Sequence, residues 1–118
     1  MQHDLKLYGE NFELMESGSK KREYRLYDEK RQLIKVGDTI RFIKLPDKDK
    51  FLYADVQSIE VFKNWYDCYK KYFEEDFKDR YASVEAVVED TYNGYYTKEE
   101  SDKYGCCAIT LSRIRKVR

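Results

Sequence analysis

Alternating apolar and polar residues predict the strands of this chain. In the longest such pattern, over 51–62, Leu52, Ala54 and Val56 share one face. The apolar residues that follow fall on the other parity, so we expect a bulge or bend near Gln57-Ser58. The predicted strands are 22–27, 39–44, 51–62 and 106–117.

Helical spacing and capping residues predict the helices. A short helix covers 10–17 and ends at Gly18. Further helices begin after the N-cap candidates Asn64 and Ser83 and after a capping box that starts at Thr97. The order is therefore a helix, several strands, two or three helices and a final strand, which is an α+β arrangement. About five short strands suit a small barrel to which the last strand returns.

The composition is that of a folded, water-soluble chain. Of the 118 residues, 42% are hydrophobic, 39% are charged and 16% are aromatic, which suits a single domain with its own core. No apolar run approaches the roughly 18 residues of a membrane-spanning helix. Met1–Asp4 begins no signal peptide, because it has neither a basic nor an apolar region. We therefore expect one cytoplasmic domain over 1–118, monomeric and without a membrane partner.

Cysteine and histidine are too few for a metal site or a histidine-based triad. The chain has 3 cysteines, Cys68, Cys106 and Cys107, and 1 histidine, His3. No CxxC pair is present, so we predict no metal and no cofactor, and we expect the thiols to be free and buried. We expect His3 to lie on a frayed terminus, which removes it from catalysis.

The net charge of zero conceals an uneven distribution. Residues 20–50 hold 11 basic and 6 acidic side chains, and residues 106–118 hold 4 basic and no acidic ones. Basic blocks of this kind can hold a phosphate or a short nucleic-acid segment. Broad binding to a duplex is not expected, because it usually requires a pI above about 9 and the pI here is 6.6.

The densest cluster of chemically active side chains is the segment 18–25. Gly18 ends the first helix, and Lys20 lies in the turn that follows. Glu23 and Arg25 are two residues apart, so they share one face of the next strand. A carboxylate, a guanidinium and an ammonium would then meet where a helix ends and a strand begins. The spacing alone favours a simpler interpretation, an ion-pair network on a solvated strand face.

This segment resembles the G-x-K-x-x-E-x-R motif of the ASCH domain, the activating signal cointegrator homology family. The motif residues are Gly18, Lys20, Glu23 and Arg25. The stretches 25–38 and 95–105 are also similar to small bacterial members, so the resemblance spans nearly the whole chain. It implies a PUA-like β-barrel of about five to six strands with flanking helices, and a cleft that holds the motif.

The resemblance also implies a function. The family is linked to RNA binding. Some small bacterial members are amidohydrolases that remove an acyl group from the exocyclic amine of cytidine. Another member has been described as a ribonuclease. The catalytic lysine of the amidohydrolases matches Lys20, whereas their threonine three residues later is replaced by Glu23, which argues against a covalent mechanism. Their third catalytic residue is a glutamate in the helical segment after the long strand. We take Glu74 for it from four candidates, Glu74, Glu75, Asp76 and Asp79.

Lys20 and Glu23 are chemically suited to amide hydrolysis. Glu23 can activate a water as a general base. Lys20 can stabilise the oxyanion that forms when water adds to the amide carbonyl. Glu23 can equally pair with Lys20 and Arg25 and only shape a binding pocket.

Aromatic residues are the second feature, with 12 Tyr, 6 Phe and 1 Trp. Their rings can stack on unpaired bases or pack against the fold. We expect packing for Trp65, Tyr69 and Tyr72.

The alternative to hydrolysis is a non-catalytic module that binds single-stranded or loop RNA. A third possibility is an interaction domain in which the motif is structural. The candidates for binding a nucleoside or RNA are Arg25, Tyr27, Lys30, Arg31, Tyr96 and Tyr104.

Overall fold

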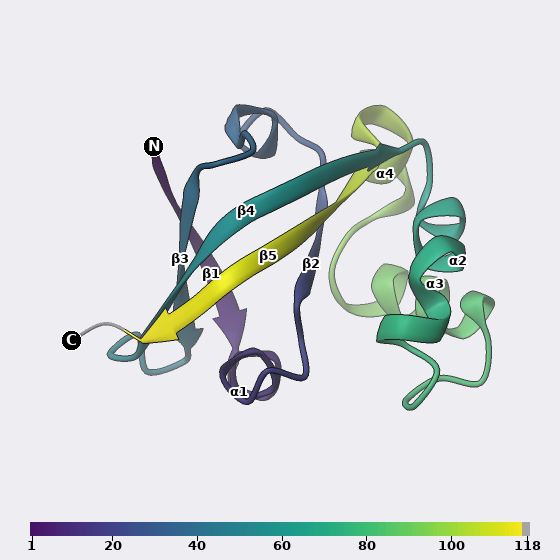
Figure 1. Ribbon diagram of the computed structural model, residues 1–118. Helices are drawn as coiled ribbons and strands as arrows, with labels where there is room; N and C mark the ends of the chain where they lie inside the picture. The colour runs from purple at the N-terminus through teal and green to yellow at the C-terminus, as the bar shows by residue number, and fades with distance from the viewer. Residues whose placement is uncertain (117–118) are drawn as a thin grey trace. The chain divides into compact units, whose positions relative to one another are not determined.

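The computed structural model describes residues 1–116, in which strands and helices follow the order shown in Figure 1. The elements are β1 (Gln2–Tyr8), α1 (Gly9–Glu16), β2 (Arg22–Leu26), the 3-10 helix η1 (Arg31–Leu33), β3 (Thr39–Leu45), β4 (Phe51–Phe62), α2 (Trp65–Asp76), α3 (Val84–Gly94), α4 (Lys98–Tyr104) and β5 (Cys106–Lys116).

The five strands that the structure describes form one sheet in the order β1-β3-β4-β5-β2, which curls as a half-barrel. The last strand, β5, returns to lie between β4 and β2. With the four α-helices this is an α+β fold. The predicted fold class is confirmed.

The chain divides into two compact units. The sheet unit consists of Met1–Glu23, Ile34–Ile59 and the residues from Ile109 onward, and the helical unit consists of Tyr24–Leu33 and Glu60–Ala108. The strands β2, β4 and β5 contribute residues to both. Lys20 and Glu23 thus belong to the sheet unit, and the other predicted site residues belong to the helical unit.

Strand register builds the core of the sheet unit. β1 pairs in parallel with β3, so that Leu5 lies beside Phe42, and β3 pairs antiparallel with β4, so that Phe42 lies opposite Leu52. None of these three side chains is more than 2% exposed. Phe12 and Met15 of α1 are buried in the same unit. One face of the strands is therefore apolar and packed, which fixes the register.

The expectation of a frayed N-terminal segment is wrong, because these residues form β1. This strand pairs with β3 over all 7 of its residues. His3 lies within it, and its Nε2 is 2.8 Å from Oδ2 of Asp38, which also accepts a hydrogen bond from the Lys35 amide at 3.0 Å. The sequence pattern did not indicate this strand, because only two buried residues, Leu5 and Leu7, alternate with more exposed ones in this segment.

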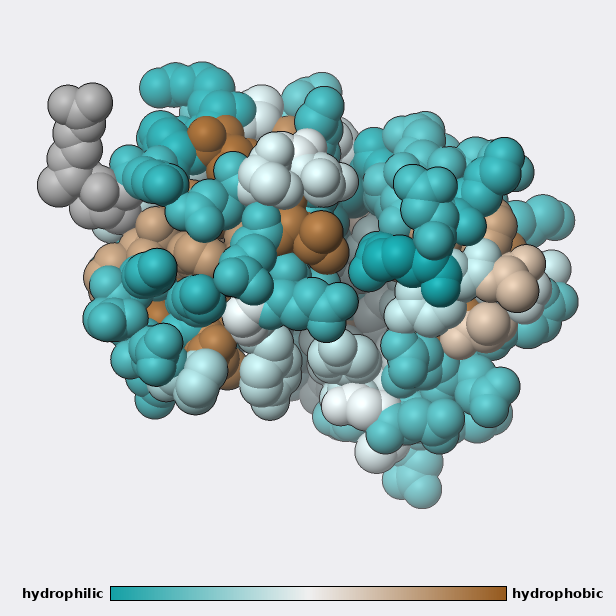
Figure 2. Space-filling model, turned by 90° about the horizontal axis from the view of Figure 1, so that it is seen from below, coloured by the Kyte–Doolittle hydropathy of each residue, from teal (hydrophilic) through white to brown (hydrophobic). Residues whose placement is uncertain are grey.

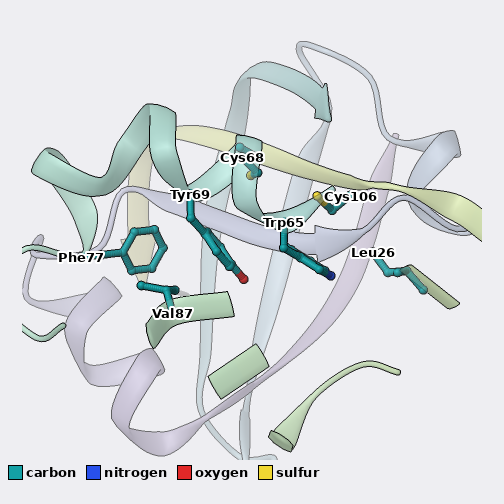
Figure 3. Packing of buried hydrophobic residues seen from close by; sticks show 8 residues of the cluster. Leu26, Trp65, Cys68, Tyr69, Phe77, Val87 and Cys106 are labelled. Carbon is teal, nitrogen blue, oxygen red and sulfur yellow. The ribbon is translucent and has the colours of Figure 1, made fainter. Parts of the chain in front are cut away.

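Large aromatic side chains form the core of the helical unit (Figure 3). The rings of Trp65 and Tyr69 stack with centroids 5.4 Å apart. Nε1 of Trp65 donates to Oγ of Ser101 at 2.9 Å, and the Tyr69 hydroxyl lies 2.7 Å from Oγ1 of Thr91, so the buried polar atoms are paired. The predicted packing roles of these aromatics are confirmed. The buried members are Leu26, Trp65, Cys68, Tyr69, Phe77, Val87, Cys106 and Ala108.

The helices begin where capping residues predict them. The side chains of Asn64 and Ser83 each accept a hydrogen bond from a backbone amide in the first turn, and Thr97 forms a complete capping box. Gly105 ends α4 with a φ of 69°, and a Cβ there would lie 2.7 Å from the Phe62 carbonyl oxygen. Glycine is the residue that fits this position.

The sequence predicts that the alternation of apolar residues changes near Gln57-Ser58, which lie in the long strand β4. The alternation of buried residues ends after Val56, and Gln57 and the residue after it are exposed. In β5 the regular strand conformation is interrupted at Arg113, whose φ of 51° is left-handed. The predicted strand 106–117 includes Val117, which lies outside the described residues.

One face of the molecule is largely hydrophilic. Figure 2 shows polar residues over most of one face, with separate hydrophobic patches between them. This fits a chain of which 39% is charged. Among residues 1–116, no helix is long and apolar enough to cross a membrane.

Candidate functional site

A tight turn after α1 positions Lys20 two residues before β2. Gly18 adopts a φ of 88° in this turn, a left-handed angle that glycine takes without strain. The amides of Ser19 and Lys20 both donate to the carbonyl of Leu14, at 2.9 and 3.0 Å. The backbone of Lys20 is therefore fixed to the end of α1, while its side chain keeps 17% exposure.

Lys20 and Glu23 form an ion pair within the sheet unit. Nζ of Lys20 lies 3.1 Å from Oε1 of Glu23 and donates to the carbonyl of Arg22 at 2.9 Å. Glu23 is only 4% exposed, and a buried carboxylate requires a charged or hydrogen-bonding partner. The structure thus brings two of the predicted catalytic residues together.

Strand β5 contacts the two residues that lie between Lys20 and Glu23. The amide of Leu111 donates to the carbonyl of Lys21 at 2.9 Å. Nε of Arg22 donates to Oγ1 of Thr110 at 3.0 Å. Glu23 therefore projects from a strand that is anchored to its neighbour, which gives its carboxylate a fixed position.

The predicted third catalytic residue, Glu74, faces solvent in the helical unit. Its side chain is 77% exposed and pairs at 3.1 Å with Lys78, four residues later and just beyond the end of α2. Of the four acidic candidates, Asp76 alone is half-buried, and its carboxylate accepts a hydrogen bond from the hydroxyl of Tyr24. Burial and bonding therefore give Asp76 a better defined position than Glu74.

The loop after β2 gives two predicted ligand-binding residues partners of their own. Nη1 of Arg31 lies 3.1 Å from Oδ2 of Asp28, and Nε of Arg31 is buried without a hydrogen-bond partner. The hydroxyl of Tyr104 donates to Glu29 at 3.3 Å. Tyr27 is half-buried. The Arg31–Asp28 pair lies within this loop, and the Tyr104–Glu29 hydrogen bond ties the loop to α4.

Tyr96, another predicted ligand-binding residue, packs on the core. Its ring stacks on Trp65 with centroids 5.5 Å apart and an angle of 13° between the planes. The face of the ring that meets Trp65 is therefore closed to a base. Arg25 is half-buried in β2, and Lys30 is exposed in the following loop.

Buried groups of the helical unit are held protonated. The hydrogen bond with Cys106 and burial raise the pKa of the Cys68 thiol, and burial raises the pKa of the Tyr69 hydroxyl. Cys68 is consequently a thiol at neutral pH and a poor nucleophile. All three cysteines are free and buried, as predicted. Within the described part of the chain, no three His, Cys, Asp or Glu side chains are grouped to hold a metal ion.

Comparison with known families and structures agrees with this fold and motif. The family model of the ASCH domain matches residues 5–115. The chain belongs to the ASCH domain family. The match includes Lys20 and Glu23, so the resemblance seen in the motif is confirmed. No curated protein matches the chain.

Solved structures share the fold along the whole ASCH domain. The hypothetical protein PH0355 is 32% identical, with a TM-score of 0.79 over 99% of this chain and 100% of that protein. Protein PF0455 from Pyrococcus furiosus is 30% identical, with a TM-score of 0.71 over 100% and 99%. ASCH from Zymomonas mobilis is 18% identical, with a TM-score of 0.67 over 98% and 69%; this likeness concerns the fold. The predicted PUA-like architecture is thereby confirmed.

Proposed function

We propose that this ASCH domain hydrolyses the acyl amide on the exocyclic amine of a cytidine. The observation that carries the proposal is the pair of Lys20 and Glu23, in which an ammonium lies 3.1 Å from a carboxylate that is 4% exposed. Family membership supports the class of substrate. The pair supports the type of reaction, because hydrolysis of an amide needs a base and a stabiliser of negative charge.

Glu23 acts as the general base in the first step. Its carboxylate takes a proton from a water while the oxygen of that water bonds to the amide carbonyl carbon. The π electrons of the carbonyl move to its oxygen, and the ammonium of Lys20 turns an N–H toward the resulting oxyanion. A preorganised charge at this place is worth a factor of roughly 10²–10³ in rate.

The second step breaks the carbon–nitrogen bond. The oxyanion reforms the carbonyl, and the proton held by Glu23 passes to the departing exocyclic nitrogen. The products are a carboxylic acid, which ionises in water, and cytidine with a free amine. One water is consumed, and Glu23 ends the cycle as a carboxylate.

A non-catalytic RNA module has less support. It would bind through side chains such as Arg31, Tyr96 and Tyr104. Arg31 is bonded to Asp28, Tyr96 is stacked on Trp65 and Tyr104 donates to Glu29, all within the helical unit. Base stacking on these residues would have to displace or share contacts that the fold already uses.

Incubation of the purified protein with N4-acetylcytidine tests the proposal. Chromatography is expected to show cytidine and acetate released in equal amounts. Lys98→Gln is the matched control, since Lys98 is 74% exposed and pairs only on the surface, and it is expected to keep the wild-type rate. If neither the nucleoside, its 5′-monophosphate nor an acetylated oligonucleotide is hydrolysed at high enzyme concentration, the proposal is rejected.

A further inference from the structure

Strand β1 is an edge strand, because within residues 1–116 the sheet pairs it with β3 alone. One side of an edge strand offers backbone groups that take no part in the ladder. The side chains on the outer face of β1 are all exposed, whereas Arg41 and Ile43 on the same face of β3 are half-buried. The exposed side chains are those of Gln2, Asp4, Lys6 and Tyr8. This edge of the sheet unit is therefore open to solvent, and amide hydrolysis does not use it.

The hydrogen bonds between β1 and β3 determine which residues face the open edge. The amide of Thr39 donates to the carbonyl of Met1 at 3.0 Å, and the parallel register continues to Tyr8↔Leu45. Successive residues of a strand direct their amide and carbonyl groups to opposite sides. Met1 and the odd-numbered residues of β1 therefore face β3. The even-numbered residues, from Gln2 to Tyr8, direct their amides and carbonyls to the open edge.

We propose that β1 pairs antiparallel with β1 of a second copy of this chain, with Leu5 at the centre of the strand pair. The dimer has two-fold symmetry, because each copy contributes the same strand. Gln2 of each copy lies opposite Tyr8 of the other, and Asp4 lies opposite Lys6. These are the residues whose backbone groups face the open edge, so the two members of each pair exchange both hydrogen bonds.

The charges on the outer face select this register. With Leu5 at the centre, Asp4 of each copy is opposite Lys6 of the other, and opposite charges in this position stabilise a strand pair. A shift by two residues brings Asp4 opposite Asp4, or Lys6 opposite Lys6, and like charges directly opposite are destabilising. A shift by one residue sets the open-edge groups against residues that already bond to β3. The edge is thus self-complementary, which identifies a second copy as its partner.

The carboxylate of Asp4 is held in place for this contact. Its two oxygens accept hydrogen bonds from Nε and Nη2 of Arg41, at 3.0 and 2.8 Å, and the guanidinium carbon of Arg41 lies 5.0 Å from the centre of the Phe51 ring. The Asp4 side chain is still 47% exposed. Each carboxylate oxygen has two lone pairs, so an ammonium of the second copy can donate to Asp4 while Arg41 stays bonded. The carboxylate is therefore preorganised beside the open edge.

The interface is small, and the association should be weak. Seven residues form β1, and a single strand pair buries less than the roughly 1,200–2,000 Å² of a stable complex. We expected a monomer from the sequence. The open edge indicates instead a monomer that dimerises reversibly, at about 0.1–1 mM.

Sedimentation equilibrium at protein concentrations up to about 1 mM tests the proposal. The wild type is expected to show a monomer–dimer equilibrium. Lys6→Pro removes an amide hydrogen from the open edge and leaves the hydrogen bonds to β3 in place. It is therefore expected to raise the dissociation constant of the dimer about ten-fold or more. Thermal melting verifies that the variant is folded.

Exchange of charge tests the register. Lys6→Glu and Asp4→Lys each place like charges opposite one another, so neither variant should dimerise by itself. An equal mixture of the two restores opposite charges in each pair, and it is expected to form a heterodimer about as tightly as the wild type dimerises. Lys98→Glu is the matched control, because it makes the same change of charge on an exposed side chain of α4, and it should dimerise like the wild type. Asp4→Lys also loses the bond to Arg41, so if melting shows it unfolded, Lys6→Pro and Lys6→Glu decide the test.

Amide hydrogen exchange measured by NMR shows whether β1 forms the contact. In dilute protein, the amides of Asp4 and Lys6 should exchange rapidly, whereas those of Leu5 and Leu7, which face β3, should exchange slowly. At about 1 mM, exchange at Asp4 and Lys6 should slow by about two-fold or more. This alternation distinguishes a strand pair from association through another surface.

A wild type that stays monomeric up to about 1 mM would overturn the proposal. The same holds for Lys6→Pro and Lys6→Glu variants that dimerise as tightly as the wild type, and for a dimer in which the amides of Asp4 and Lys6 remain unprotected. The proposal is independent of hydrolysis. Lys20→Met should lose hydrolysis of N4-acetylcytidine and dimerise like the wild type, whereas Lys6→Pro should keep the wild-type rate of hydrolysis.

Discussion

The ammonium of Lys20 lies 3.1 Å from Oε1 of Glu23, and the two side chains differ in their access to solvent. Glu23 is 5% exposed and Lys20 is 17% exposed at the side-chain level. A molecule that approaches the pair from solvent therefore meets the lysine more readily than the carboxylate. This order suits a reaction in which the ammonium binds a carbonyl oxygen and the carboxylate then acts on a water.

Lys20→Met tests how far the burial of Glu23 depends on its partner. Methionine keeps the aliphatic stem but removes the charge, so the free energy of unfolding should fall by about 1–3 kcal/mol. Urea denaturation measures this change. Lys98→Met is the control, because its ion pair with Asp102 is exposed and should be worth less than about 0.5 kcal/mol. Equal losses in the two variants would show that Glu23 does not depend on Lys20.

Gly105→Ala is expected to destabilise the protein by clearly more than about 1 kcal/mol. The position has a φ of 69°, and the added Cβ would meet the Phe62 carbonyl oxygen at 2.7 Å. Gly94→Ala is the matched control, since its added methyl group would point into open space, and it should be neutral or slightly stabilising. Thermal melting compares the two, and similar melting temperatures would refute this role of Gly105.

Asp38→Asn is expected to reduce stability in a pH-dependent way. The hydrogen bond with His3 is the main cause that lowers the pKa of Asp38 from 3.8 to about 2. Because the folded pKa lies below the unfolded one, the ionised carboxylate stabilises the fold above pH 3.8, and this contribution is lost as the pH falls toward about 2. The difference in melting temperature between wild type and variant should therefore narrow across this window. A difference that stays constant down to pH 2 would count against the His3 contact.

Local features of the fold could be predicted from the sequence, and long-range ones could not. The caps at Asn64 and Thr97 depend on residues within one turn, so the helix starts were correct. The sequence pattern did not predict β1, because its parallel partner, β3, is distant in the chain. Gln2 at the start of β1 pairs with Thr39, which is 37 residues later. Its own pattern holds only Leu5 and Leu7 as buried residues.

In the candidate site, too, local features could be predicted from the sequence and long-range ones could not. Lys20 and Glu23 are three residues apart, so their motif identified them together. The choice between Glu74 and Asp76 depends on Tyr24, which is 52 residues away from Asp76 in the chain. The position of Arg41 over Phe51 depends on the pairing of β3 with β4, which the sequence pattern does not specify.

The most direct test of Glu23 as the base compares kcat/KM for N4-acetylcytidine between the wild type and Glu23→Gln. Glutamine keeps the size of the side chain and can still accept a hydrogen bond from Lys20, but it cannot take a proton from water. The ratio should fall by about 100-fold or more, while thermal melting shows a folded variant. Hydrolysis by Glu23→Gln at the wild-type rate would contradict the proposed mechanism.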